Sequence, residues 1–368
     1  MENRNEYVHT VYDALHQIPE PGYKEFKTSE FIESELKKWG YKIHRNVANS
    51  TGIIAVLDSN REGPFVGIRA DMDALPYQMD GRIEYRHTCG HDAHSSIALA
   101  VARSIYSSGV ARGKLYFIFQ PAEELLTGAK TVISSGLLND MTHIIGMHIR
   151  PYQECLFGQA APALWHSALA RLNIKLTGIT AHAGRAHLGA NPIETAILIA
   201  NAINTIKINP QVSSSINITR VNTGDNAENS LPEELNMCID VRCADNTTMR
   251  TLLEELNLRV ESCAKITRTK AACTVSCCPA AEYSSDMIDA ASRAIEKVLG
   301  ADGLVEEIHT VGAEDFHYYT KEIGCKAAYV ALGANAKPGL HHKEMVFERK
   351  ALDNGVDIFL EIINTILN

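Results

Sequence analysis

No stretch of this 368-residue chain has the run of about 18 apolar residues that a membrane-spanning helix requires. The first residues, "MENRNEYVHTVYDALHQ", are polar with a helical pattern, so we expect no secretory signal core. The net charge is -9, and no cluster of lysine or arginine stands out that could neutralise phosphates. We therefore expect neither a membrane nor a nucleic acid as a partner.

The nine cysteines include no CxxC pair, and their number is odd. A chain of this length, with 45% hydrophobic residues, can build a large core without disulfide stapling. We expect free thiols in a reducing compartment, which predicts a cytoplasmic protein. Since a single core stops growing at roughly 250–300 residues, the length favours two domains.

The sequence pattern changes twice along the chain. Up to about residue 167, strand-like segments such as "PFVGIRADMD" alternate with helical segments such as "HSSIALAVARSIYSSG", which predicts an α/β domain. We expect this domain to have a mostly parallel sheet flanked by two layers of helices, and to comprise residues 1–167 and 275–368. Alternating strands and amphipathic helices over residues 168–274 predict an inserted small α+β sandwich.

Polar residues follow several of the predicted buried strands. "RADMD", "QPAEE" and "GMHI" all fall at strand ends. Because chemistry in open α/β sheets gathers outside the carboxyl ends of the strands, this edge is the candidate site.

The stretch "YRHTCGHDAHSSIALA" places one cysteine among three histidines, His87, His91 and His94. A structural zinc site would need four closely paired ligands, and that pattern is missing. A catalytic metal site, a nucleophilic cysteine and a buried thiol beside surface histidines remain open from these residues alone. We interpret His87 and His94 as neighbours of the site, with His94 as a cap of the helix that follows.

Other loops add possible metal donors. Glu123 and Glu124 end one strand, His148 ends another, and His341 and His342 lie in a Pro/Gly loop. Taken singly, each has an ordinary structural explanation. Together with Cys89, they give thiolate, imidazole and carboxylate donors on separate loops of one domain, as expected for a hydrolytic metal centre.

Seven motifs in order make a resemblance specific: "GIRADMDALP", "HTCGHDAHSSIALA", "FQPAEE", "GMH", "AHAGRAHLGANPI", "VGAEDF" and "GLHH". The chain resembles the aminoacylase/carboxypeptidase superfamily of metal-dependent amidohydrolases over nearly its whole length. Within this superfamily, the cysteine of "CGHD" makes the chain similar to the branch of hippurate hydrolases, N-acetyl-diaminopimelate deacetylases and auxin-conjugate hydrolases.

The resemblance implies a centre of two divalent metal ions per subunit, with zinc, manganese, cobalt or nickel as candidates. It implies five metal ligands, namely Cys89, His91, Glu124, His148 and His341. Glu123 would be the general base, and Asp71 and Asp73 would orient ligands rather than bind metal. The motif favours His341 over the adjacent His342.

The resemblance also implies that the inserted domain is a lid and a possible homodimer interface. His182 would stabilise the oxyanion, from its own subunit or from a partner. Asn229 and Arg242 would bind substrate, although Arg242 could equally form an ordinary strand salt bridge.

The expected function is the hydrolysis of the amide bond of small N-acyl amino acids to a carboxylic acid and an amine. A dipeptidase or aminopeptidase with the same metal site is the alternative. A binding protein that has lost the chemistry is disfavoured, because Glu123 and all the implied ligands are present.

Overall fold

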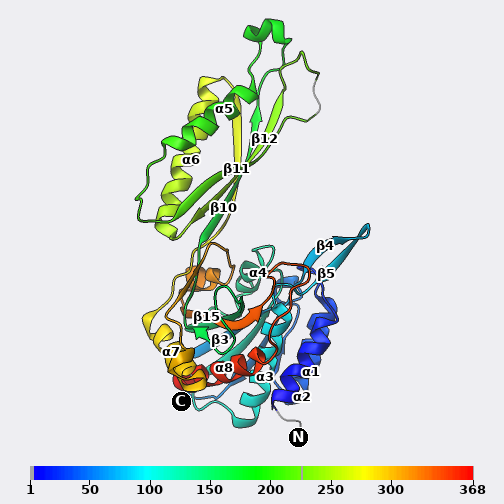
Figure 1. Cartoon of the computed structure of the whole chain (residues 1–368), viewed down its shortest axis with the longest axis vertical. Helices are drawn as coiled ribbons and strands as arrows, with labels where there is room; N and C mark the ends of the chain where they lie inside the picture. The colour runs from blue at the N-terminus through cyan, green and yellow to red at the C-terminus, as the bar shows by residue number, and fades with distance from the viewer. Residues whose placement is uncertain (1–3, 225–226, 368) are drawn as a thin grey trace. The chain divides into compact units, whose positions relative to one another are not determined.

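A computed structural model describes residues 4–224 and 227–367 of the chain. The chain divides into two compact units (Figure 1). The first comprises Met1–Trp165, Glu282–Thr310 and Glu314–Asn368, and the second comprises His166–Ala281 and Val311–Ala313. No helix within the described ranges is both long and apolar enough to cross a bilayer.

The first unit is built on a seven-stranded sheet. Its strands, in spatial order, are β1 (Lys42–His44), β2 (Ile53–Asp58), β6 (Lys114–Gln120), β3 (Phe65–Asp71), β7 (His143–Pro151), β15 (Lys326–Ala336) and β8 (Ala160–Ala161). The four strands from β6 to β15 run parallel to one another. The two strands β1 and β2 on one side, and β8 on the other, pair antiparallel.

The α/β class is therefore confirmed, but the sheet is mixed rather than mostly parallel as predicted. The direction of β2 explains the difference. Only residues 59–64 separate β2 from β3. A parallel crossover needs a dozen or more residues, so this short loop reverses the chain and β2 pairs antiparallel with β6.

Helices pack on this sheet and supply much of the core. They are α1 (Arg4–His16), α2 (Phe26–Trp39), α3 (His91–Ser108), α4 (Gly128–Ser134), α7 (Ser285–Leu299) and α8 (Ala351–Leu367). Helix α3 contacts β3, β6 and β7 as well as α1, α2 and α8. Its alanines and serines let it lie buried along most of its length, and it ends at Ser108, just before Gly109.

A hairpin of β4 (Leu75–Met79) and β5 (Arg82–Arg86) leads from β3 to α3. A further small sheet pairs β9 (Leu164–His166) with β14 (Ile308–Thr310).

The second unit has a four-stranded antiparallel sheet covered by two helices (Figure 1). The sheet order is β11 (Ser214–Asn222), β12 (Glu234–Cys243), β10 (Ala168–Thr177) and β13 (Lys270–Cys278). The helices are α5 (Pro192–Ala202) and α6 (Asn246–Ile266). Burial alternates along β10 and β12, so one face of the sheet packs on the helices and the other faces solvent.

Candidate metal centre

The parallel strands of the first unit bring separate polar segments to one edge of the sheet. Strands β3 and β6 are paired in parallel up to Asp71 and Gln120, so both end at that edge. Asp73 follows β3, and Glu123 and Glu124 follow β6. His148 lies near the end of β7. The loop after β15 then contributes His341, and the start of α3 contributes Cys89 and His91.

Gly90 separates the cysteine from the first histidine of α3, and its backbone requires glycine. Its φ is +92°, a region that residues with a Cβ rarely adopt. A Cβ added here would lie 2.4 Å from Cδ1 of Ile149. The sharp turn at Gly90 places Cys89 just before the helix and His91 at its first position. One possible metal-binding atom of each lies within 4.8 Å of the other and of one on His148.

The thiol of Cys89 lies at the centre of the donor cluster. Its Sγ is 3.3 Å from Nε2 of His148 and 3.2 Å from Nε2 of His341. The same sulfur belongs to two groups of possible metal ligands, one with His91 and His148 and the other with Glu124 and His341. The cluster therefore offers two overlapping donor sets that share one sulfur.

Of the two adjacent histidines in the C-terminal loop, the structure brings His341 to the cluster. Its Nε2 lies 3.5 Å from Oε1 of Glu124. Its backbone N–H donates to Thr88 O, and the hydroxyl of Tyr77 donates to its carbonyl oxygen, each at 2.8 Å. The Nδ1 of His342 instead accepts the backbone N–H of Glu344 at 3.2 Å.

Two buried atoms of the cluster that could bind a metal ion have no hydrogen-bond partner. They are Nε2 of His91 and Oε1 of Glu124, 3.9 Å apart. Buried polar atoms are nearly always paired in native proteins, so these two indicate a ligand between them. A soft thiolate, imidazoles and a carboxylate suit a divalent transition metal, so the residues present fit the predicted metal ions.

Asp73 holds three parts of the cluster together. Its Oδ1 lies 3.1 Å from Nδ1 of His91, so the free Nε2 of that ring faces the other donors. Its carboxylate also accepts the backbone N–H groups of Glu123 at 3.1 Å and Glu124 at 3.0 Å. An ordered carboxylate behind a histidine ligand fixes the ring orientation. The orienting role of Asp73 stays a prediction.

Asp71 is held by His94 and Arg69 and lies near Nε2 of His91, on the side of the ring opposite to Asp73. Its Oδ1 contacts Nδ1 of His94 at 2.7 Å, and its Oδ2 accepts from Arg69 at 2.6 Å. Oδ2 lies 3.7 Å from Nε2 of His91. Burial works against ionisation of Asp71, but the nearby His91, His94 and Arg69 hold the pKa of its carboxyl well below the usual range.

The prediction that His94 caps the following helix is wrong. Helix α3 starts at His91 after Gly90, and His94 lies inside its first turn. The Nδ1 of His94 contacts Asp71, its Nε2 accepts the N–H of Ile149 at 3.1 Å, and its ring packs edge-on against His148 at 4.5 Å. The spacing of His91 and His94, three residues apart on a helix, was the available signal for a shared face.

Arg69 is the main contributor that the sequence interpretation missed. It is 2% exposed and pairs with Asp71, Glu314 and Asp315, the latter two at 2.9 Å. Gln120 also accepts from it at 3.0 Å. An arginine inside the buried strand "FVGIRAD", whose residues before it are apolar, was the signal, since buried arginines need paired carboxylates.

Glu123 lies in an acidic and dry environment. It is 6% exposed, and its Oε2 is 3.8 Å from Nε2 of His91. A carboxylate oxygen of Glu123 lies within 4.8 Å of donor oxygens of Glu314 and Asp315. Burial, and then the charges of Glu314 and Glu124, raise the pKa of Glu123 well above its usual range. Such a carboxylate binds a proton readily.

Burial also sets the protonation of the other donors. It raises the pKa of the Cys89 thiol well above its usual range and that of Glu124 to about 7. It lowers the pKa of His148 well below its usual range, so this imidazole is neutral and has a lone pair available. Bound metal favours the thiolate and the carboxylate, since these ligands bind deprotonated.

The remaining predicted residues, His182, Asn229 and Arg242, lie in the second unit. His182 is exposed, and its Nδ1 accepts the N–H of Gly184 at 3.0 Å. The carbonyl of Asn229 accepts the N–H of Ala183 at 2.8 Å, so these two segments are adjacent. Arg242 contacts Asp240 at 3.0 Å and donates to Val311 O at 2.9 Å. The roles of His182, Asn229 and Arg242 stay predictions.

Comparison with known proteins extends over most of the chain. Residues 67–365 match the family model described as "Peptidase family M20/M25/M40". A hippurate hydrolase of Campylobacter jejuni is 27% identical over 96% of this chain and 94% of its own length. An N-acetyldiaminopimelate deacetylase of Listeria innocua is 29% identical over 98% and 99% of the two chains.

A solved structure extends the likeness to the fold. The crystal structure of a dinuclear metal-binding peptidase of the M20 family from Bacillus subtilis superposes with a TM-score of 0.81 and 25% identity, covering 99% of this chain and 98% of that one. The resemblance stated from the motifs is confirmed. This chain belongs to the peptidase family M20/M25/M40.

Proposed function

We propose that this chain is an amidohydrolase with two divalent metal ions, which cleaves N-acyl amino acids to a carboxylic acid and a free amino acid. The observation that carries the proposal is the position of Cys89 in two donor sets at once. The metal ligands would be Cys89, His91, Glu124, His148 and His341. The unpaired atoms of His91 and Glu124 support this assignment.

The activity class follows from the family, whose membership confirms a hydrolase of amide bonds. The substrate class is supported by the relatives, because hippurate and N-acetyldiaminopimelate are both N-acyl amino acids. In each, the scissile amide joins an acyl group to the nitrogen of an amino acid.

When bound, a pair of divalent ions lowers the pKa of a water and polarises the scissile carbonyl. Glu123 supplies the proton chemistry. Its buried carboxylate takes a proton from the attacking water and returns it to the leaving nitrogen. Asp73 keeps His91 and both glutamate backbones fixed during the step.

The second unit would complete the site as a lid. His182 is assigned to oxyanion stabilisation, and Asn229 and Arg242 to binding of the substrate. The exposure of His182 and the pairing of its segment with that of Asn229 support a shared role at one surface. For Arg242, the role requires release from Asp240, because that carboxylate already holds the guanidinium.

The second unit would also form a homodimer. Helix α5 exposes three apolar side chains, namely Ile193 at 39%, Ile197 at 56% and Leu198 at 36%. Strand β11 is an edge strand of its sheet and so has backbone groups available for pairing. Light scattering should give a dimer mass for the wild type, and Ile197→Glu should shift it to the monomer. The reducing, cytoplasmic location predicted from the cysteines belongs to the same proposal.

The direct test is a substrate panel run with added zinc, manganese, cobalt or nickel. Acetyl, benzoyl and indole-acyl amino acids should be cleaved, and a chelator should abolish the reaction. Free dipeptides are the matched control, because they carry the same amide bond with an unblocked amine. Cleavage of dipeptides without cleavage of N-acyl amino acids would establish the dipeptidase or aminopeptidase alternative.

A further inference from the structure

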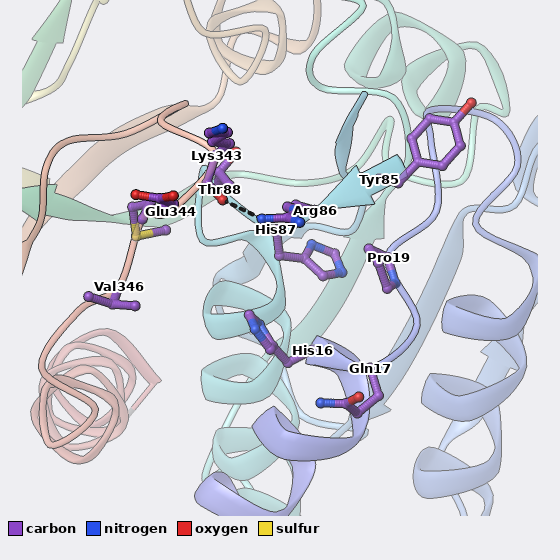
Figure 2. A pocket seen from close by; sticks show the side chains of 11 residues that line it. His16, Gln17, Pro19, Tyr85, Arg86, His87, Thr88, Lys343, Glu344 and Val346 are labelled. Carbon is purple, nitrogen blue, oxygen red and sulfur yellow. Dashed lines mark hydrogen bonds between the residues drawn. The ribbon is translucent and has the colours of Figure 1, made fainter. Parts of the chain in front are cut away.

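A pocket of about 470 Å³ lies in the first unit (Figure 2). His16 at the end of α1 forms one wall. The segment from Tyr85 to Thr88, just before Cys89, forms another, and the segment from Lys343 to Val346, just after His341, forms a third. None of the five proposed metal ligands lines this pocket.

Among the buried residues that line the pocket, His87 has ring nitrogens without a hydrogen-bond partner. It is 5% exposed, and both of these nitrogens are buried. Buried imidazoles usually make at least one hydrogen bond, so this ring lacks the partner that its site should hold. Figure 2 shows the ring of His16 near that of His87, and the two ring centroids are 6.5 Å apart. Since neither nitrogen of His87 is exposed, a ligand reaches it by a turn of the ring.

Two opposite charges are available at the rim of the pocket. Lys343 and Glu344 are both exposed lining residues, and neither side chain forms an ion pair within residues 4–224 and 227–367. The other charged groups are already engaged. Arg86 donates to Lys343 O and to Glu84, and His16 pairs with Asp92 at 2.6 Å.

We propose that this pocket binds a free α-amino acid. Lys343 would pair with the carboxylate and Glu344 with the ammonium group, which suits a zwitterion better than an ion of one sign. The apolar side chains of Pro19, Met345 and Val346 line the same pocket and would contact the ligand side chain. The turned ring of His87 adds one hydrogen bond to the ligand.

The pocket is connected to the metal centre through the two loops that form its walls. The N–H of His341 donates to Thr88 O at 2.8 Å, and Arg86 donates to Lys343 O at 3.0 Å. His87 is two residues before Cys89, so a ligand bound to its ring would act on the segment that positions the thiol. Occupancy should therefore lower kcat. This part of the inference rests on the proposed function. The ligand is then the amino acid that the hydrolysis releases, and the lower kcat is product inhibition.

Binding is tested by calorimetry on the metal-loaded full chain with L-methionine. Lys343→Gln and Glu344→Gln should each weaken the binding of L-methionine to this pocket about fivefold, which is the effect of losing one exposed ion pair. His87→Gln should weaken it about tenfold. Lys350→Gln and Glu348→Gln are matched controls, since both are exposed charges a few residues further along the chain and neither lines the pocket.

Equal binding of L-methionine by the pocket variants and the controls overturns the proposal, since the amino acid would then bind only at the metal centre. Equal binding of L-methioninamide, which lacks the carboxylate, also overturns it. The two rim variants keep the test valid if His87→Gln does not fold.

Kinetics give the second readout. L-methionine should lower kcat of the wild type, and Lys343→Gln and Glu344→Gln should lose this effect while keeping the basal kcat. Purely competitive inhibition in the wild type overturns the regulatory part. If the chain fails to cleave N-acyl amino acids, the proposed function fails, but the calorimetric result on the pocket still decides the binding.

Discussion

The Oδ1 atom of Asp73 lies 3.1 Å from Nδ1 of His91, which leaves Nε2 of that imidazole facing the other metal donors. The same carboxylate accepts the backbone N–H groups of Glu123 and Glu124. One side chain therefore orients a proposed ligand, and it also fixes the loop that carries the second ligand and the proposed base.

Asp73→Ala should weaken metal binding by about 10–100-fold, the usual effect of removing a carboxylate behind a histidine ligand. The measurement is a metal titration of the purified, metal-free protein. Asp302→Ala, at an exposed aspartate of the same unit, should bind metal as the wild type does. Wild-type affinity in Asp73→Ala would show that the contact with His91 has no effect on the metal.

His341 and His342 provide a paired test of the ligand set. His341→Asn should reduce the bound metal from about two ions per chain to one, because its imidazole lies against Cys89 and Glu124. Asparagine tolerates the positive φ of +63° at this position, so the backbone is kept. His342→Asn should retain both ions. The reverse pattern would assign the ligand to His342.

Arg69 neutralises a buried acidic cluster formed by Asp71, Glu314 and Asp315. Removing one partner of a buried ion pair leaves uncompensated charge and costs about 3–5 kcal/mol. Arg69→Met should therefore lower the free energy of unfolding, measured in urea, by about that amount. The exposed Arg82→Met is the control. A change below about 1 kcal/mol for Arg69→Met would contradict the importance of this network.

Glu25 makes stability depend on pH. It is fully buried, its Oε1 accepts the N–H of Ala122 at 2.9 Å, and burial raises its pKa from 4.5 to about 7. The folded protein therefore binds this proton more tightly than the unfolded chain does. The contribution to stability is present below pH 4.5 and is lost as the pH rises through about 7.

Glu25→Gln keeps the acceptor oxygen and has no proton to lose. Relative to the wild type, its free energy of unfolding should rise by up to about 3 kcal/mol between pH 4 and pH 8. Urea unfolding at several pH values measures the difference. For Glu30→Gln, at an exposed position of α2, the free energy of unfolding should depend on pH in the same way as that of the wild type. A parallel curve for Glu25→Gln would mean that the carboxyl is ionised at neutral pH in the folded protein.

Some of the possible metal ligands can be predicted from the sequence, because polar residues follow buried, apolar strands. Glu124 and His148 come at the ends of predicted strands, and parallel strands bring such ends to one edge. Cys89 precedes a predicted helix and His341 lies in a predicted loop, so their places were suggested by residue type and by the motifs. The direction of β2 is harder to predict, because it depends on the six-residue loop 59–64 and on the choice of β6 as its neighbour.

The charged layer beneath the site could not be predicted from the sequence. Arg69 is separated from Glu314 and Asp315 by about 245 residues, and only the folded sheet brings them to 2.9 Å. His94 was similarly ambiguous, since a histidine in the first turn of a helix fits both a cap and a buried contact. Its hydrogen bond to Asp71 depends on how α3 packs against β3.

In the proposed mechanism, Glu123 moves the proton in a metal centre that other residues hold. The most direct measurement is therefore turnover of an N-acyl amino acid by Glu123→Gln, together with its metal content. We expect about two bound ions per chain and a kcat at least about 100-fold below that of the wild type. Wild-type turnover by Glu123→Gln with both ions bound would contradict the account.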